Sequence, residues 1–280
     1  MAYRFVKSHG LGNDYLVVDR CDLSWTPARV RAVCDRNKGL GSDGLLLATS
    51  SDTADYGLRI FNPDGSEAEK SGNGLRIFAR YLVDNHNAPL EFSVETLGGL
   101  VHCKVSDASI TVDMGRATFE PSDLPVITDE ATTDHLVIDL EDKSLVATGV
   151  SVGNPHAVIF VDAPFETLDW RKWGAAIETH DMFPERTNVQ FVQIMSRSHV
   201  VARIWERGAG ETSASGSSSC AIVAAGVRRK LLDQKVTVES AGGLLQIQIT
   251  EDYDLRLKGP VEHVADIVTS TGFSTTLAAL

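Results

Sequence analysis

Apolar residues follow two different spacings along the chain, and together these spacings predict a mixed α+β fold. Most apolar runs are short, rich in Val and Ile, and in several cases alternate with polar residues, which is typical of β-strands. We expect a strand at the start, in residues 1–7, and further strands at 15–19, 44–48, 57–61, 90–95, 99–105, 109–113, 136–139, 157–161, 189–194, 199–205, 236–239, 244–250 and 254–258.

Helical spacing of apolar residues is clearest in two segments, 73–86 and 218–232. Each segment begins at a turn rich in Gly and Ser, so each helix is expected to start there. Weaker patterns predict helices at 26–34 and 168–179. Residues 117–134 contain two prolines and show little periodicity, so we expect a linker.

The two helix-starting turns belong to an internal duplication. Ser71-Gly72-Asn73-Gly74 and Ser215-Gly216-Ser217-Ser218 lie 144 positions apart, and Arg59-Ile60 and Arg203-Ile204 repeat at the same offset. The chain is therefore expected to form two similar α+β domains, residues 1–118 and 119–263. The tail, 264–280, is expected to pack back onto the first domain.

Charge and cysteine content narrow the class of protein. The chain of 280 residues has 26 basic and 38 acidic side chains, which argues against nucleic acids and anionic membranes as partners. No apolar run reaches the roughly 18 residues of a membrane-spanning helix, and the start lacks the apolar core of a signal peptide. Cys21, Cys34, Cys103 and Cys220 have neither metal-site spacing nor disulfide density. We expect a cytoplasmic protein without a bound metal.

The repeated turns suit an anionic ligand. A Gly-rich turn that opens a helix leaves backbone N–H groups unpaired, with the positive end of the helix dipole behind them. Two such turns could hold one carboxylate, with Ser71 and Ser215 on opposite faces of the adjacent carbon, an arrangement suited to moving a proton between faces. The alternative is that both serines only cap their helices. The matched flanking residues favour the functional interpretation.

Polar residues at predicted strand ends suggest that the ligand is an amino acid. Asn13, Asn62, Asn154 and Asn188 each stand beside Gly, Pro or Thr, and Glu206-Arg207 precede the second turn. Any single Asn could be a turn former. As a set, these residues could recognise both a carboxylate and an ammonium group.

The motifs together resemble the diaminopimelate epimerase family. They run from His9-Gly10-Leu11-Gly12-Asn13-Asp14 through Asn62-Pro63-Asp64-Gly65 and Gly153-Asn154-Pro155-His156 to Glu206-Arg207-Gly208-Ala209-Gly210. The resemblance implies two domains, each with a mostly antiparallel sheet wrapped around a central helix. It also implies an active site in the inter-domain cleft, no cofactor, a homodimer, and an isomerase of lysine biosynthesis that interconverts LL- and meso-diaminopimelate or a similar amino acid.

The resemblance also assigns roles to residues. It implies that Asn13, Asn62, Asn154, Asn188, Glu206 and Arg207 hold the non-reacting end of the substrate, and that Gly72, Asn73, Gly216 and Ser217 bind the carboxylate at the reacting end. The family places cysteine at the two proton-transfer positions, where this chain has Ser71 and Ser215. The family also usually has glutamine at the position of Gly44.

The two serines leave three interpretations open. Serine is a weak base unless another group accepts its proton. The chain could be an epimerase whose two catalytic cysteines were exchanged for serine. It could be a divergent relative, an isomerase, a lyase or a racemase of another substrate, in which His156, Glu67 or Glu69 assists a serine. It could also be an inactive amino-acid-binding protein.

Overall fold

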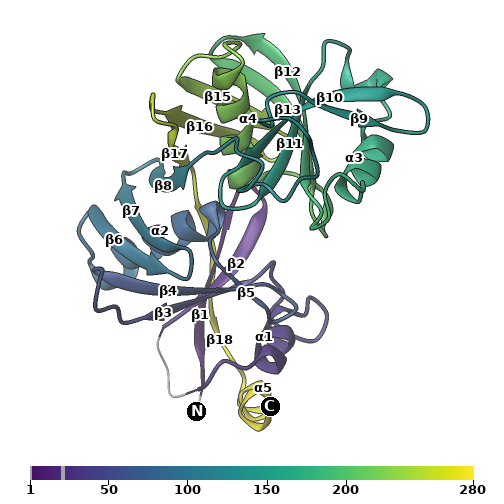
Figure 1. The fold of residues 1–280 in the computed structure, drawn as a ribbon. Helices are drawn as coiled ribbons and strands as arrows, with labels where there is room; N and C mark the ends of the chain where they lie inside the picture. Colours follow the sequence, from purple (N-terminus) through teal and green to yellow (C-terminus); the bar gives the residue numbers. More distant parts are fainter. Residues whose placement is uncertain (1, 20–22) are drawn as a thin grey trace. The chain divides into compact units, whose positions relative to one another are not determined.

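The computed structural model describes residues 2–19 and 23–280, and within them the chain forms two compact units. Met1–Val112 with Gly259–Leu280 form unit 1, and Asp113–Lys258 form unit 2. Figure 1 shows the mixed helices and strands of each unit. The predicted α+β class with two similar halves is confirmed. The domain boundaries at residues 118 and 263 stay a prediction, and Cys21 lies outside the described residues.

Unit 1 is built on a mixed sheet. Strand β1 lies between β18 and β2 and is antiparallel to both. Strand β2 is parallel to β3, and β3 is antiparallel to β4. Strand β4 is parallel to β6, and β6, β7 and β8 then follow one another as antiparallel neighbours. The short β5 pairs with β4. The strands are β1 (Arg4–Gly10), β2 (Asn13–Val18), β3 (Leu45–Thr49), β4 (Tyr56–Phe61), β5 (Glu67–Ala68), β6 (Glu91–Thr96), β7 (Gly99–Val105) and β18 (Glu262–Val268), with β8 (Ile110–Arg116) running across the boundary at residue 112.

Helix α2 (Gly72–His86) is the central helix of unit 1. It packs against β1, β2 and β7, strands from separate parts of the sheet, so the sheet wraps around it. Leu75 and Phe78 are fully buried. Asn87 ends the helix in the left-handed conformation that Asn tolerates. Unit 1 has two further helices, α1 (Pro27–Cys34) and α5 (Thr271–Ala279). The Arg29 guanidinium of α1 donates hydrogen bonds to the backbone oxygens of Leu277 and Ala278 in α5.

Unit 2 repeats this plan around helix α4 (Gly216–Arg228). Its parallel pairs, β11 with β12 and β13 with β15, correspond to the parallel pairs of unit 1. Strand β9 pairs with β10 as β18 pairs with β1, and α3 (Trp170–Glu178) corresponds to α1. A short 3-10 helix, η1 (Phe165–Thr167), precedes α3. The strands are β9 (Leu136–Asp139), β10 (Ser144–Ser151), β11 (Pro155–Phe160), β12 (Asn188–Ser196), β13 (His199–Glu206), β14 (Gly210–Thr212), β15 (Lys235–Ser240), β16 (Gly243–Ile249) and β17 (Asp254–Gly259).

Hydrogen bonds outside the regular elements repeat with the duplication. The Gly98 amide donates to the carbonyl oxygen of Glu69, and the Gly242 amide donates to that of Ser213. Both pairs lie immediately around the repeated turn and are related by the same 144 positions. The similarity seen in the sequence is therefore a similarity of backbone structure.

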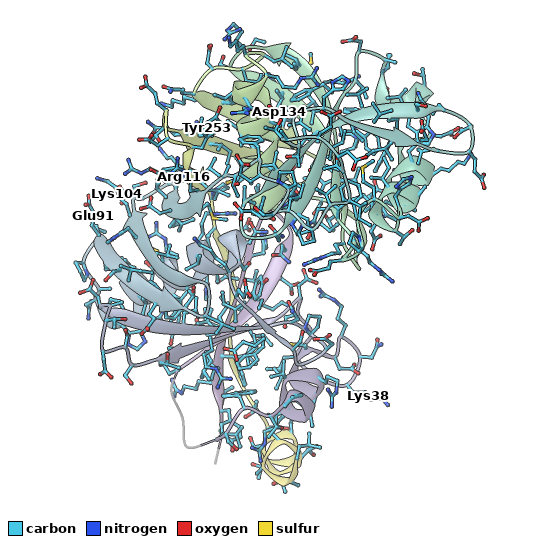
Figure 2. All side chains as sticks on the ribbon, viewed as in Figure 1. Lys38, Glu91, Lys104, Arg116, Asp134 and Tyr253 are labelled. Atoms are coloured by element: carbon cyan, nitrogen blue, oxygen red, sulfur yellow. The ribbon has the colours of Figure 1, made fainter. Side chains whose placement is uncertain are left out.

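The segment 117–134 was expected as a linker, and that expectation is wrong, because the segment packs into unit 2. Phe119 is buried edge-on against the Tyr253 ring, and Leu124 is fully buried. Asp134 forms a two-pronged ion pair with Arg228 at the end of α4, near Tyr253 (Figure 2). The apolar residues of this segment lack a regular spacing because they pack into unit 2 without forming a helix or a long strand, and not because the segment is exposed to solvent.

Several elements were absent from the expected set. Strand β10 has few large apolar residues, β18 is mostly exposed, and the sequence of α5 lacks a clear helical pattern. Helix α4 ends before the expected residue 232, because Lys230 has a positive φ of 59° and the amides of Leu231 and Leu232 turn back to the Gly226 oxygen. In the described part of the chain, no helix is long and apolar enough to cross a membrane.

Leu124→Ala tests the packing of the segment 117–134. Truncating a fully buried leucine leaves a cavity, so we expect the free energy of unfolding to fall by about 2–5 kcal/mol in denaturant titrations. Ile127→Ala in the same segment is the control, because Ile127 is 67% exposed and its truncation should change stability by at most about 0.5 kcal/mol. Equal effects of the two substitutions would contradict the packing described here.

Candidate functional site

Ser71 caps helix α2 and fixes the shape of the first turn. Its backbone is extended, and its Oγ accepts a hydrogen bond of 3.0 Å from the Gly74 amide, while its carbonyl oxygen accepts from Leu75. Helix geometry therefore leaves the amides of Gly72 and Asn73 without partners within the helix. These two N–H groups, at the positive end of a helix of 15 residues, form a candidate carboxylate site.

The Ser71 hydroxyl has a second neighbour that the sequence did not suggest. Tyr15 on β2 is buried, and its hydroxyl lies 3.2 Å from the Ser71 Oγ. Either oxygen can donate in this contact. The Ser71 oxygen therefore lies between a backbone amide and a phenol.

Asn13 and Asn73 are in direct contact beside this turn. The Asn73 side-chain amide donates to Asn13 Oδ1 at 3.0 Å, and Asn13 in turn donates to Asp43. Asp43 belongs to a charged cluster in which Arg36 bridges Asp43 and Asp14. Although burial opposes it, the positive charges of Arg36 and Lys7 lower the pKa of Asp14. This cluster holds Asn13 in place.

Asn73 also has a buried oxygen available for a ligand. The residue is 94% buried, and its Oδ1 has no hydrogen-bond partner within the described structure. A buried, unsatisfied carbonyl oxygen costs free energy, so an N–H or ammonium donor is the natural ligand for it.

Two residues near the first turn have other contacts. Asn62 is exposed, and its side chain donates to Ser66 Oγ within the β4–β5 turn. Glu67 pairs through both oxygens with Arg59, which lowers the pKa of Glu67. A carboxylate held in this way is a poor base for assisting a serine.

Ser215 reproduces the first turn in unit 2. The backbone angles φ and ψ are −140° and 128° at Ser215, against −139° and 117° at Ser71. Its Oγ accepts from the Ser218 amide at 3.4 Å and lies 3.4 Å from the Ser217 Oγ. The amides of Gly216 and Ser217 take the places of those of Gly72 and Asn73.

A buried hydrogen-bonded chain connects Asn154 to the second turn. The Gln190 amide nitrogen lies 3.0 Å from both His156 Nδ1 and Ser218 Oγ, and His156 Nε2 lies 2.9 Å from Asn154 Oδ1. Since an amide nitrogen only donates, Nδ1 accepts and Nε2 carries the imidazole proton. Burial, together with the charge of Arg207, lowers the pKa of His156 to about 3.

This chain changes the interpretation of His156. The imidazole is fully buried, neutral, and hydrogen-bonded at both nitrogens. It therefore holds Asn154 and Gln190 in place, and its contacts argue against the assisting base considered from the sequence.

Asn188, Glu206 and Arg207 lie at the ends of β12 and β13. The Arg207 amide donates to Asn188 Oδ1 at 3.0 Å, and the Asn188 side chain donates to the Pro155 oxygen. Glu206 accepts from the Thr212 hydroxyl. Arg207 is exposed and donates to the Glu185 oxygen, so its guanidinium retains further donors.

Sequence reasoning missed Tyr15, Gln190 and Ser218. Gln190 could have been found, because it stands two residues after Asn188 in a strand and therefore faces the same side. Tyr15 gave no such signal, since its hydroxyl reaches Ser71 only through the pairing of β2 with its neighbours. Ser218 was read only as the start of a helix.

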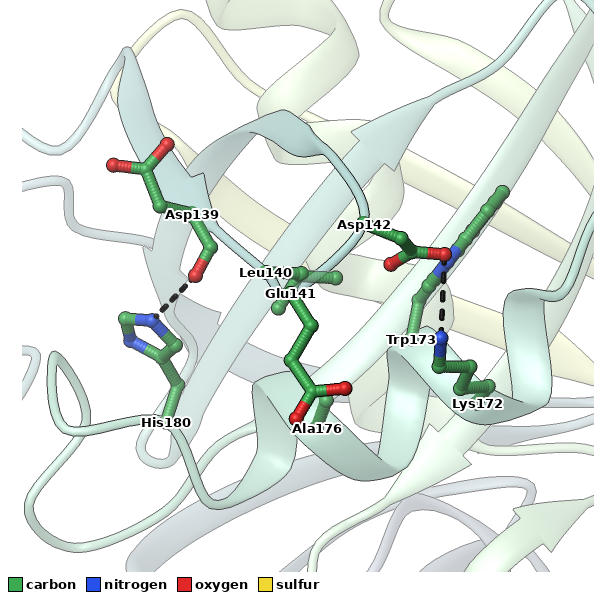
Figure 3. A pocket seen from close by; sticks show the side chains of 8 residues that line it. All are labelled: Asp139, Leu140, Glu141, Asp142, Lys172, Trp173, Ala176 and His180. Carbon is green, nitrogen blue, oxygen red and sulfur yellow. Dashed lines mark hydrogen bonds and ion pairs between the residues drawn. The ribbon is translucent and has the colours of Figure 1, made fainter.

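A surface pocket in unit 2 lies apart from these residues. It is formed by the β9–β10 turn and α3, and Figure 3 shows Lys172 paired with Asp142 and His180 donating to the Asp139 oxygen. None of the sequence-predicted site residues lines it. Among the described residues, no group of three or more His, Cys, Asp or Glu side chains could hold a metal ion.

Solved structures share this duplicated fold. One is a hydroxyproline epimerase from Agrobacterium vitis, with a TM-score of 0.71 and 14% identity, covering 96% of this chain and 93% of that one. Another is a PhzF-family phenazine biosynthesis protein from Bacillus anthracis, with a TM-score of 0.69 and 14% identity, covering 96% and 99%. At this identity the likeness establishes the fold: the chain has the two-domain architecture of PhzF proteins and of this epimerase.

Sequence comparison narrows this class to a family. The sequence pattern of the diaminopimelate epimerase family matches residues 5–120 and 148–264. A protein named diaminopimelate epimerase 2 from Nostoc sp. is 44% identical over 274 residues, covering 96% of each chain. The diaminopimelate epimerase of Neisseria meningitidis is 43% identical over 272 residues, covering 93% of this chain and 96% of its own. The chain belongs to the diaminopimelate epimerase family.

The neutral His156 predicts a particular pH dependence of stability. In the unfolded chain a histidine ionises near pH 6.5, whereas His156 in the folded protein does so only at about 3. The unfolded state therefore binds the extra proton, and stability present above pH 6.5 is lost as the pH falls towards 3. We expect wild-type protein to lose more unfolding free energy between pH 6.5 and 4.5 than His156→Gln, by up to about 1.4 kcal/mol per pH unit.

The measurement is a series of denaturant titrations of both proteins across this pH range. The difference between the two should be constant above pH 7, which separates any lost packing from the proton effect. The ¹⁵N shifts of the His156 ring give a second readout, since they should report the Nε2–H tautomer throughout. Parallel stability curves, or an imidazolium signal at pH 5, would contradict the buried neutral histidine.

Proposed function

We propose that this protein is a cofactor-independent amino-acid epimerase that interconverts LL- and meso-diaminopimelate or a closely similar amino acid. The observation that carries the proposal is the pair of serine-capped helix N-termini with nearly the same backbone angles, in a chain of the diaminopimelate epimerase family. Family membership favours this function over a lyase or an inactive amino-acid-binding protein.

The two turns supply the carboxylate site in this proposal. The amides of Gly72 and Asn73, and those of Gly216 and Ser217, donate to the carboxylate next to the reacting carbon. Removing the α proton places negative charge on this group, so the helix dipoles stabilise the transition state more than the ground state.

The remaining predicted residues bind the other polar groups of the substrate. Asn73 Oδ1 is supported as an ammonium acceptor by its burial without a partner. The exposed guanidinium of Arg207 suits a distal carboxylate. The full proposed binding set at the distal end is Asn13, Asn62, Asn154, Asn188, Glu206 and Arg207.

Ser71 and Ser215 carry the two proton transfers. One hydroxyl oxygen takes the α proton, and the other gives a proton to the opposite face of the resulting carbanion. An unassisted serine makes this slow, because its acidity is far from the working pH. We therefore expect low but measurable turnover.

Deuterium exchange tests the proposal. The protein is incubated in D₂O with LL- or meso-diaminopimelate, and loss of the α-proton signal is followed by NMR. We expect saturable exchange and interconversion of the two isomers. Saturable binding without exchange would overturn the epimerase proposal and support a binding protein.

Serine-to-cysteine exchange provides the matched comparison. Ser71→Cys with Ser215→Cys should raise kcat by about 10²–10⁴-fold, because a thiol at a helix N-terminus ionises near neutral pH. Each single variant should gain less, since both faces must work in each turnover. Ser217→Cys controls for a thiol placed at the second turn but outside the transfer position. A double variant no faster than wild type would contradict the assigned positions.

We also propose that the protein forms a homodimer in the cytoplasm. The dimer is supported by β18, on which Val264 and Val268 are 52% and 60% exposed. The cytoplasm is supported by the low cysteine content, four in 280 residues, and by the burial of Cys34, Cys103 and Cys220.

Sedimentation equilibrium tests the dimer. We expect twice the chain mass of 30.3 kDa for wild type and the monomer mass for Val264→Lys with Val268→Lys. Leu97→Lys is the control, because Leu97 is 66% exposed in the turn between β6 and β7. A monomeric wild type would overturn the proposal.

A further inference from the structure

Tyr15, Gly44 and Ser71 form a small cluster in unit 1 that the family resemblance does not account for. The Tyr15 hydroxyl lies 3.2 Å from Ser71 Oγ, and Tyr15 as a whole residue is 93% buried. Gly44 lies directly against this ring. The cluster therefore places a second ionisable oxygen next to the predicted proton-transfer oxygen.

Gly44 makes room for the ring. A β-carbon at position 44 would lie 2.6 Å from Cε1 of Tyr15 and 2.5 Å from the Phe61 oxygen, both too close for a real contact. Its φ is not positive, so backbone conformation does not require a glycine here. Its carbonyl oxygen also accepts from the Leu16 amide, which holds this stretch against β2. A side chain at position 44 would therefore collide both with the Phe61 backbone and with the Tyr15 ring, and glycine leaves room for both.

A larger residue at position 44 and the observed Tyr15 ring are mutually exclusive, so Gly44 and the contact of Tyr15 with Ser71 belong together. Serine is the residue that needs help, because an aliphatic hydroxyl is about as weak an acid as water, whereas a phenol is a much stronger acid with a pKa of about 10.

We propose that Tyr15 is a positioning and proton-relay residue that acts through Ser71, and that Gly44 leaves room for its ring. This inference rests on the proposed epimerase function. After Tyr15 has given its proton to solvent, Ser71 Oγ takes the α proton while the Ser71 hydroxyl proton passes to the Tyr15 phenolate. The electron pair of the C–H bond stays on the substrate as a carboxylate-stabilised carbanion.

The reverse step uses the same atoms. Ser71 gives its hydroxyl proton to the carbanion and takes the phenol proton of Tyr15, and the phenolate regains a proton from solvent. The hydrogen bond also holds the Ser71 oxygen in one orientation. The second turn differs: in the described structure, the hydroxyl beside Ser215 Oγ is that of Ser217, which is another serine and not a phenol. The two proton-transfer positions are therefore chemically unequal.

Exchange from the two stereoisomers tests the relay. The α proton of one substrate configuration faces Ser71 and that of the other faces Ser215. Tyr15→Phe keeps the ring and removes the hydroxyl, so we expect kcat for exchange from one configuration to fall by about 10²-fold, with exchange from the other and KM nearly unchanged. A merely structural loss would slow exchange from both configurations and raise KM.

Tyr81→Phe is the matched control. Tyr81 is equally buried in unit 1, and its hydroxyl contacts His86 at 3.2 Å, at the far end of α2 from Ser71. This variant should exchange both configurations at the wild-type rate.

The outcomes separate the relay from the function on which it rests. Wild type that exchanges neither configuration overturns both proposals. Active wild type with an unchanged Tyr15→Phe, or with equal losses from both configurations, overturns the relay alone. With Ser71→Cys as the background, Tyr15→Phe should cause little loss, because a thiol does not need the phenol; an equal loss in both backgrounds would contradict the relay.

Discussion

The capping hydrogen bond from a backbone amide to a serine oxygen is the interaction on which the candidate site depends. In each unit the serine Oγ accepts a hydrogen bond from the backbone amide three positions later, which sets the first helical turn. The amides of the two residues in between then point away from the helix. A hydroxyl that caps a helix is held in one place, and that place is the position from which it could reach a ligand on the amides. Structural capping and the proposed chemistry therefore use the same atoms.

Around this shared geometry, the two units support their turns by different means. In unit 1 the support is charged and partly exposed: Arg36 and Lys7 fix Asp14 and Asp43, and these hold Asn13. In unit 2 it is neutral and buried, through Gln190, His156 and Asn154. Salt should weaken the first support much more than the second, because screening acts mainly on exposed charges.

The sequence alone was sufficient to predict those elements whose residues follow a local pattern of apolar spacing. The helix beginning at Ser71, the duplication, and β7 from 99 to 105 could all be read from spacing. Strand β10 could not be predicted in this way, because its Gly, Ala and Ser residues have no clear strand pattern of their own. They are held in a strand by hydrogen bonds to β9 and β11. Contacts between distant residues were also out of reach. Tyr15 and Ser71 are 56 residues apart, and only the folded sheet brings their oxygens together.

The hydrogen bonding of β18 to β1 has a consequence for synthesis of the chain. Tyr3 and Thr269 exchange backbone and side-chain hydrogen bonds across 266 positions, so unit 1 needs two segments that are far apart in the sequence. Unit 2 is continuous from Asp113 to Lys258. On the ribosome, unit 2 can therefore complete its sheet first, while β1 waits with an unpaired edge until the last residues emerge. The nascent first half is the part of this protein with the longest exposure to chaperones and to mispairing.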